Sequence, residues 1–192
     1  MQILSLIDKS VMTEKEISAG CQRADARARE MLYTRYSGRL LATAMRYMGS
    51  REEAEDVLHD AFITAYRSFD KFEYRGEGSR AAWLQRIVVN RSLDALRIRQ
   101  KSILEPLDSD ADEPEVDADD VDTIPRDELL RLVASLPDGY RTVINMYAFD
   151  GLSHKEIAER LGISEKTSSS QFFRAKKLLA KMINDYLTKT ER

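Results

Sequence analysis

The chain has 192 residues, which is enough for one medium-sized domain or two small ones. Glycine (8) and proline (4) are scarce, which argues against an all-β fold with many tight turns, and the single cysteine excludes an internal disulfide. Because no apolar run is long enough for a membrane span or the core of a signal peptide, we expect a cytoplasmic protein with no membrane insertion of its own.

The first block of the chain, residues 13–101, has the apolar periodicity of a helical bundle. We expect helices near Thr13–Gln22, Ala24–Met48, Arg51–Phe69 and Ser79–Arg99. Two glycines in the segment 73–80 predict an ordered loop before the last of these helices. The residues before Thr13 are weakly patterned, and Met12 is an alternative start.

The third helix of this block has two faces of different chemistry. An apolar face with a four-residue spacing should point inward: Val57, Ala61, Ala65 and Phe69. The other face is acidic and aromatic, which suits a basic protein partner better than DNA: Asp56, His59, Asp60 and Tyr66. Since the chain has only one other histidine and one cysteine, His59 does not indicate a metal site, and we expect no cofactor.

The fourth helix carries a narrow stripe of polar and aromatic residues spaced three or four apart: Trp83, Arg86, Asn90, Asp94, Arg97 and Lys101. Cations neutralise phosphates, asparagine can bond to a base edge, and an indole offers a stacking surface. This pattern predicts a surface that reads opened DNA. The alternative is that Trp83 fills the core and the charges are simply solvated.

A strongly acidic segment follows, with ten carboxylates and no Lys or Arg between Glu105 and Asp122. The whole chain has a net charge of −3, so removing these ten charges leaves +7 on the remainder. The segment is poor in large apolar residues and contains prolines, so we interpret residues 102–125 as a flexible linker.

The second block, residues 126–188, ends in a pattern typical of a helix-turn-helix. Ser153 and Glu156 form a capping-box pair that starts a helix, Gly162 supplies the turn, and Ser164 can cap the next helix. The alternative is an ordinary helical hairpin. We therefore expect an all-α protein of two small helical domains joined by the acidic linker.

The last helix separates its apolar and basic residues. The outward arc from Lys166 to Lys181 contains no acid and exposes Phe173 among cations, as a helix in a DNA major groove would. The candidate DNA contacts are Lys166, Thr167, Ser169, Ser170, Phe173, Arg174 and Lys177. Ser168 falls on the buried side, where many helix-turn-helix proteins have an aliphatic residue, and we expect its hydroxyl to bond to a carbonyl one turn back.

Three segments in this order and spacing resemble the extracytoplasmic-function (ECF) group of sigma-70 family initiation factors. They are AEDVLHDAFITAYRSFDKF, AAWLQRIVVNRSLDALR and SLPDGYRTVINMYAFDGLSHKEIAERLGISEKTSSSQFFRAKKLL. The resemblance covers nearly the whole chain from Thr13 onward. It implies a sigma region 2 helical bundle and a sigma region 4 helix-turn-helix.

The resemblance also implies roles for the candidate residues. The surface with Asp56, His59, Asp60 and Tyr66 would dock on the coiled-coil of the largest polymerase subunit, and region 4 would dock on the polymerase flap. The loop Tyr74–Ala82, including Tyr74 and Arg80, would join Trp83 and Asn90 in capturing an unpaired base of the −10 element. Ser169, Ser170, Phe173 and Arg174 match the positions that touch the −35 element, and many relatives are held inactive by an anti-sigma factor.

The resemblance has departures and the function has alternatives. Arg80 and Ala81 stand where many members have an aromatic residue or lysine, and Ser169 and Gln171 replace frequent arginines. The other functional interpretation is a stand-alone helix-turn-helix regulator, which leaves the Trp83–Lys101 stripe unexplained. An enzyme is not expected, because the sequence has no nucleophile motif, paired-carboxylate site or metal cluster.

Overall fold

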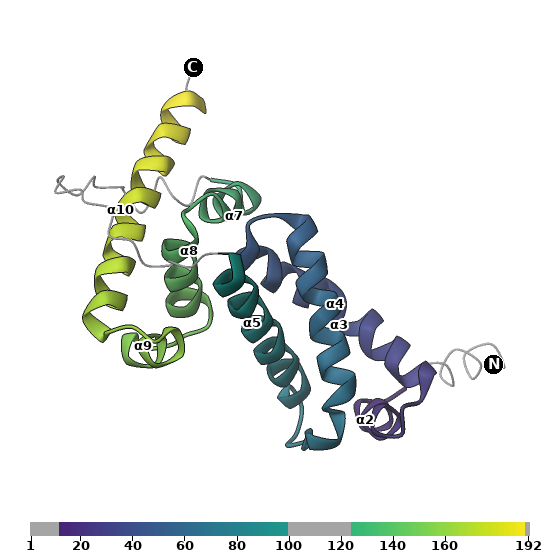
Figure 1. The fold of residues 1–192 in the computed structure, drawn as a ribbon. Helices are drawn as coiled ribbons and strands as arrows, with labels where there is room; N and C mark the ends of the chain where they lie inside the picture. The colour runs from purple at the N-terminus through teal and green to yellow at the C-terminus, as the bar shows by residue number, and fades with distance from the viewer. Residues whose placement is uncertain (1–11, 100–123, 191–192) are drawn as a thin grey trace. The chain divides into compact units, whose positions relative to one another are not determined.

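A computed structural model describes residues 12–99 and 124–190 (Figure 1). Almost all of the predicted linker, together with Lys101, lies outside the described residues. Every regular element in the described ranges is a helix, which confirms the all-α prediction.

The first part of the chain forms a helical bundle whose elements follow the predicted order. The elements are α2 (Glu14–Gln22), α3 (Ala26–Met48), α4 (Arg51–Arg67), the 3-10 turn η1 (Phe69–Lys71) and α5 (Ser79–Arg99). The bounds of α5 agree with the prediction at both ends. The prediction ran α4 on to Phe69, but the chain tightens into η1 there, and Phe69 and Phe72 are buried.

The second part contains the predicted helix-turn-helix. Its elements are α7 (Arg126–Ala134), α8 (Asp138–Ile144), the π-helical turn η2 (Asn145–Phe149), α9 (His154–Leu161) and α10 (Glu165–Thr190). Pro125 and Pro137 immediately precede α7 and α8. An amide hydrogen at the start of a helix has no partner within the helix, so proline loses no hydrogen bond there.

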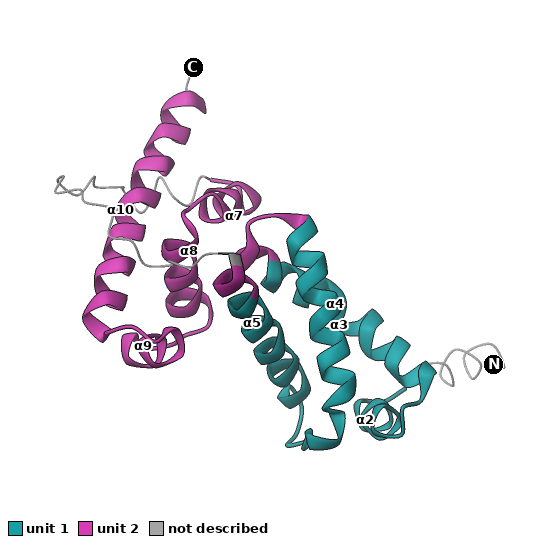
Figure 2. Cartoon of the chain, in the orientation of Figure 1, with its two compact units in different colours: residues 1–44, 52–94 teal, residues 45–51, 95–192 magenta. Residues whose placement is uncertain are grey.

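Contacts divide the chain into two compact units, which Figure 2 shows in different colours. Unit 1 comprises residues 1–44 and 52–94, and unit 2 comprises residues 45–51 and 95–192. The unit boundaries fall within α3 and α5, and the predicted domain bounds stay a prediction.

Unit 1 has a conventional apolar core between its helices. The inward face predicted for α4 is buried, as are Leu84 and Val88 of α5. Gly20 lets α2 and α3 approach closely, because a Cβ atom there would lie 2.4 Å from the Cβ of Ala28. Cys21 is a buried core residue, and its burial raises the pKa of its thiol to about 11.

Unit 2 is built around α10, whose apolar face packs on α7 and α8. The core includes Val133, Leu136, Tyr140, Ile144 and Ala175. A second anchor is the buried guanidinium of Arg141, which donates to the carbonyl oxygens of Tyr47 (2.8 Å) and Leu136 (2.7 Å). Arg141 thereby satisfies the last carbonyls of α3 within unit 2. Among the described residues, no helix has the length and apolar character needed to cross a membrane.

Candidate nucleic-acid interface

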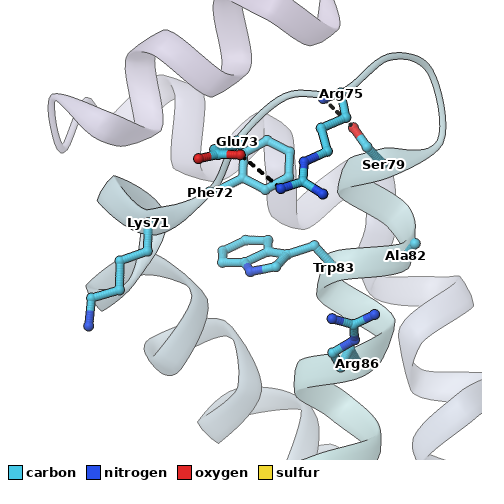
Figure 3. A pocket seen from close by; sticks show the side chains of 8 residues that line it. All are labelled: Lys71, Phe72, Glu73, Arg75, Ser79, Ala82, Trp83 and Arg86. Carbon is cyan, nitrogen blue, oxygen red and sulfur yellow. Dashed lines mark hydrogen bonds and ion pairs between the residues drawn. The ribbon is translucent and has the colours of Figure 1, made fainter.

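Unit 1 has a surface hollow of about 470 Å³ beside Trp83, which we call the Trp83 pocket (Figure 3). Its volume falls within the range of about 300–1,000 Å³ of small-ligand pockets. Its walls come from η1, the loop that follows it and the first turns of α5: Lys71, Phe72, Glu73, Arg75, Ser79, Ala82, Trp83 and Arg86. Three of these side chains are cationic and one is acidic, so the lining favours an anion or an electron-rich ring.

The indole of Trp83 is held by two phenylalanines. Its ring lies 5.2 Å from that of Phe69 in an edge-on arrangement and 5.0 Å from that of Phe72. Trp83 is nevertheless only partly buried, because it also lines the pocket. Trp83 therefore contacts the core and also presents a surface to the pocket, and its reading of opened DNA stays a prediction.

The loop over the pocket is shaped by local hydrogen bonds. The hydroxyl of Ser79 donates to the carbonyl of Gly76 (2.7 Å) and accepts from the amide of Arg75 (3.3 Å). Gly76 and Gly78 have φ angles of +113° and +83°, a region that residues with a side chain rarely adopt. Arg75 also pairs with Glu73 at 2.9 Å, and Figure 3 shows the pair beside the Phe72 ring.

One predicted DNA contact in this region is not at the surface. Arg80 is 1% exposed, and its guanidinium donates to the carboxylate and carbonyl of Glu14 and to the hydroxyl of Ser18. Arg80 is the second residue of α5, and from this position its side chain points toward α2 instead of the pocket. The assignment of Arg80 to a DNA surface is therefore corrected.

The remaining members of the predicted stripe fall into different surroundings. Arg86 is exposed at the pocket and Asn90 is exposed one turn further along α5. Asp94 pairs with Arg91 at 3.7 Å, and the guanidinium of Arg97 donates to the carbonyl of Arg160 (2.8 Å) within unit 2. The stripe is thus not one uniform surface, and Trp83, Arg86 and Asn90 are its accessible part near the pocket. Tyr74 is 46% exposed on the adjacent loop.

The predicted partner surface on α4 is only partly available. Asp56, His59 and Asp60 are exposed. Tyr66 is half-buried, its hydroxyl donates to the carbonyl of Arg29 (3.0 Å), and burial raises its pKa to about 12. Tyr66 therefore serves packing inside unit 1 with its hydroxyl already paired. Among the described residues no group of three or more His, Cys, Asp or Glu side chains could hold a metal ion.

The helix-turn-helix of unit 2 is set by its caps. Ser153 and Glu156 form the predicted reciprocal capping box at the start of α9. Gly162 ends α9 with a φ angle of +70°, in the left-handed region. The hydroxyl of Ser164 then accepts from the amide of Thr167 (2.9 Å) at the start of α10. Thr167 is partly buried. Its own hydroxyl belongs to this cap, because it lies 2.7 Å from the hydroxyl of Ser164.

The outward face of α10 is the second candidate interface, and we call it the α10 basic face. It consists of Lys166, Ser169, Ser170, Phe173, Arg174 and Lys177. Phe173 is 50% exposed, and the other members are exposed or partly exposed. An exposed phenylalanine among cations and short hydroxyls is a surface that suits base edges and phosphates.

Two details on the other side of α10 differ from expectation. Ser168 is fully buried as predicted, but its hydroxyl lies 3.0 Å from Nδ1 of His154 rather than bonding to a carbonyl one turn back. The His154 ring stacks on Tyr147 of η2 at 4.7 Å and meets the ring of Phe172 of α10 at 5.6 Å. Gln171, which stands where family members frequently have an arginine, is 4% exposed and faces inward.

Sequence reasoning missed several pocket residues. Lys71, Phe72 and Glu73 line the Trp83 pocket, and Glu14 pairs with Arg80 across 66 positions. The alternation of charged and aromatic residues in KFEYR was the available signal for the pocket. The sequence has no comparable signal for Glu14, because only the fold brings α2 to the start of α5.

Comparisons with known proteins agree with this architecture. Residues 32–102 match the family model described as Sigma-70 region 2, and residues 126–179 match that described as Sigma-70, region 4. The ECF RNA polymerase sigma-E factor of Haemophilus influenzae is 31% identical over 90% of this chain and 96% of its own. The RNA polymerase sigma-H factor of Pseudomonas aeruginosa is 29% identical over 91% and 95%.

A solved structure is also similar to this chain, namely that of the sigma factor RpoE in complex with the anti-sigma factor NepR from Bartonella quintana. It is 22% identical, with a TM-score of 0.49, and the match covers 85% of this chain and 98% of that one.

The two family models divide the chain at the acidic segment, with region 2 carrying the Trp83 pocket and region 4 carrying the α10 basic face. The relatives match nearly their full length and are initiation factors and not enzymes. The chain belongs to the ECF group of sigma-70 family RNA polymerase sigma factors.

Proposed function

We propose that this chain binds core RNA polymerase and directs it to promoters, reading −35 duplex with the α10 basic face and an unpaired −10 base in the Trp83 pocket. The observation that carries the proposal is the pocket itself: a partly exposed indole, backed by two phenylalanines, lies beside exposed cations. Base stacking on an aromatic side chain contributes about 1–3 kcal/mol, which offsets much of the cost of removing a base from the duplex.

The α10 basic face supports the duplex-reading part. Its cations can neutralise phosphates, and its hydroxyls and Phe173 can contact base edges and a thymine methyl group. In the same proposal the exposed Asp56, His59 and Asp60 of α4 face a basic surface of the polymerase, the coiled-coil of its largest subunit. Region 4 would dock on the flap, and the protein would act in the cytoplasm. A cognate anti-sigma factor stays a prediction from the family resemblance.

The experiment is a pull-down with core polymerase followed by run-off transcription from genomic fragments. We expect the chain to bind core and to start transcripts at defined sites. The isolated chain should bind duplex DNA weakly, because each helical block has only a small net positive charge and can therefore make few phosphate contacts. A stand-alone helix-turn-helix regulator would instead bind one duplex tightly without polymerase, and that result would overturn the proposal.

Asn90 offers a sharper test within the holoenzyme. Asn90→Ala should reduce promoter opening, measured by permanganate reactivity of unpaired thymines, while leaving the affinity for core polymerase unchanged. Asp56→Asn together with Asp60→Asn should do the reverse, because these exposed carboxylates lie on the proposed polymerase surface. If both variants lost promoter opening and core binding equally, the assignment of core binding to α4 and of promoter opening to α5 would be wrong.

A further inference from the structure

Arg80 is the largest fully buried side chain of the described residues, and its position is costly in two ways. A guanidinium removed from water must be paired and hydrogen-bonded. It also lies at the second residue of α5, where the helix dipole is positive and disfavours a cation. A nearby anion is therefore required for this arrangement to be stable.

Glu14 is that anion, and it collects three partners. Its carboxylate accepts from the guanidinium of Arg80, from Nη1 of Arg35 (2.6 Å) and from the hydroxyl of Tyr36 (2.9 Å). As the first residue of α2, it sits at a helix N-terminus, which favours the charged carboxylate. Glu14 thus ties the start of α2 to α3 and to the start of α5, within unit 1.

The contacts continue from Arg80 to the Trp83 pocket. The Arg80 guanidinium carbon lies 5.8 Å from the ring centre of Phe72 and 5.9 Å from that of Tyr74. Phe72 in turn contacts Trp83 and lines the pocket. A chain of contacts therefore leads from Glu14 through Arg80 and Phe72 to the indole.

We propose that Glu14 is a positioning residue of the Trp83 pocket, which acts through Arg80 to hold Phe72 and the Tyr74 loop in the shape that receives an unpaired base. The receiving of a base rests on the proposed function. The positioning of the Trp83 surroundings by Glu14 does not, so the two are tested separately.

Trp83 is the only tryptophan in the chain, so its fluorescence reports on the pocket directly. In the free full-length chain, Glu14→Gln should shift the emission to longer wavelength and raise the acrylamide quenching constant, because Phe72 loses its support. The milder Glu14→Asp should shift both in the same direction by less. The matched control is Glu16→Ala, which breaks the capping box of α2 two residues away but does not contact Arg80.

In the holoenzyme, Glu14→Gln should reduce open complexes about tenfold at a promoter identified by run-off transcription, equivalent to about 1.4 kcal/mol. The affinity for core polymerase should be unchanged, and Glu16→Ala should open the promoter like the unaltered chain. The amount of open complex formed by Arg80→Lys should lie between that of Glu14→Gln and that of the unaltered chain. Lysine keeps the charge, but its single ammonium group cannot replace the several donors of the guanidinium.

Each outcome of these experiments supports or overturns the positioning role of Glu14. Unaltered Trp83 fluorescence in Glu14→Gln, or equal fluorescence changes in Glu14→Gln and Glu16→Ala, would overturn the positioning role. Equal losses of core binding and opening would also overturn it, because they indicate a general folding role. If the unaltered chain opened no promoter at all, the proposed function would fail, while the fluorescence of the free chain would still decide the role of Glu14.

Discussion

The Trp83 pocket and the α10 basic face are both rich in cations, but they are built in different ways. The pocket is concave and needs η1, a glycine-containing loop and α5 to pack together, with the buried Arg80 and its partner Glu14 behind it. The α10 basic face lies on one continuous helix, and its members are spaced by helical periodicity alone.

This difference has an energetic consequence. Residues that form one packed pocket share partners, so their contributions should be large and non-additive. Residues on the outward face of a helix act through separate contacts, so their contributions should be smaller and should add. Four predictions test this contrast and the helix ends that support it, in order of decreasing expected effect.

The largest effect should come from Trp83→Ala. Loss of the stacking surface should reduce promoter opening by about 1–3 kcal/mol, or roughly five- to 150-fold. Permanganate reactivity of the opened region measures this effect, and core polymerase binding and thermal unfolding serve as controls. Trp83→Phe should retain part of the activity, because a smaller ring can still stack. Normal opening by Trp83→Ala would remove the pocket from the mechanism.

An effect no larger than this, and more local, is expected on the α10 basic face. Arg174→Ala should weaken holoenzyme binding to a −35 duplex fragment by about 1–3 kcal/mol if the guanidinium bonds to a base, and by less if it meets a phosphate. Phe173→Ala should add to it independently, since the two side chains project separately from one helix. Strong coupling between the two in a double-mutant cycle, measured by fluorescence anisotropy, would contradict independent action along this face.

The turn of the helix-turn-helix should respond to a single glycine. Gly162→Ala should destabilise the protein by about 1–2 kcal/mol, because an L residue is strained in the left-handed conformation. Differential scanning calorimetry should show a lower Tm. Gly38→Ala is the matched control: Gly38 lies within α3, where an added Cβ atom would meet nothing within 4 Å, so alanine should stabilise the helix. A higher Tm for Gly162→Ala would show that the turn does not set the position of α10.

The smallest effect concerns the two matched capping boxes, one in each unit. Hydrogen bonds from the backbone and hydroxyl of Thr13 and of Ser153 lower the pKa of Glu16 and of Glu156 below the usual value of 4.5. A lowered folded-state pKa contributes stability above the unfolded pKa, and this contribution is lost as the pH falls through the folded value.

Glu156→Gln keeps the capping geometry without the charge, so it should be less stable than the unaltered chain at neutral pH, and this difference should be smaller at about pH 3. Urea unfolding at the two pH values measures the gap. A gap of constant size would mean that the charge of Glu156 contributes nothing at the start of α9.

The helical architecture was largely predictable from the sequence. Capping residues, turn glycines and the period of the apolar residues placed α5 and the α9–α10 turn correctly, because these signals act over a few residues. The same period separated the inward face of α10, with Ser168 and Ala175, from its exposed basic face. Local physics was enough wherever one helix carries the whole feature.

Only the tertiary structure decided which polar residues stay at the surface. Arg80 and Gln171 are residue types that often contact nucleic acids, but packing turns both side chains inward. The hydroxyl of Ser168 pairs with His154 from another helix. The Trp83 pocket and its link to Glu14 join residues up to 72 positions apart. Burial there depends on the packing of α2 against α5 rather than on any local pattern. A charge can be kept in an interior only if the fold supplies its partner, and the identity of that partner is fixed by the packing of whole helices.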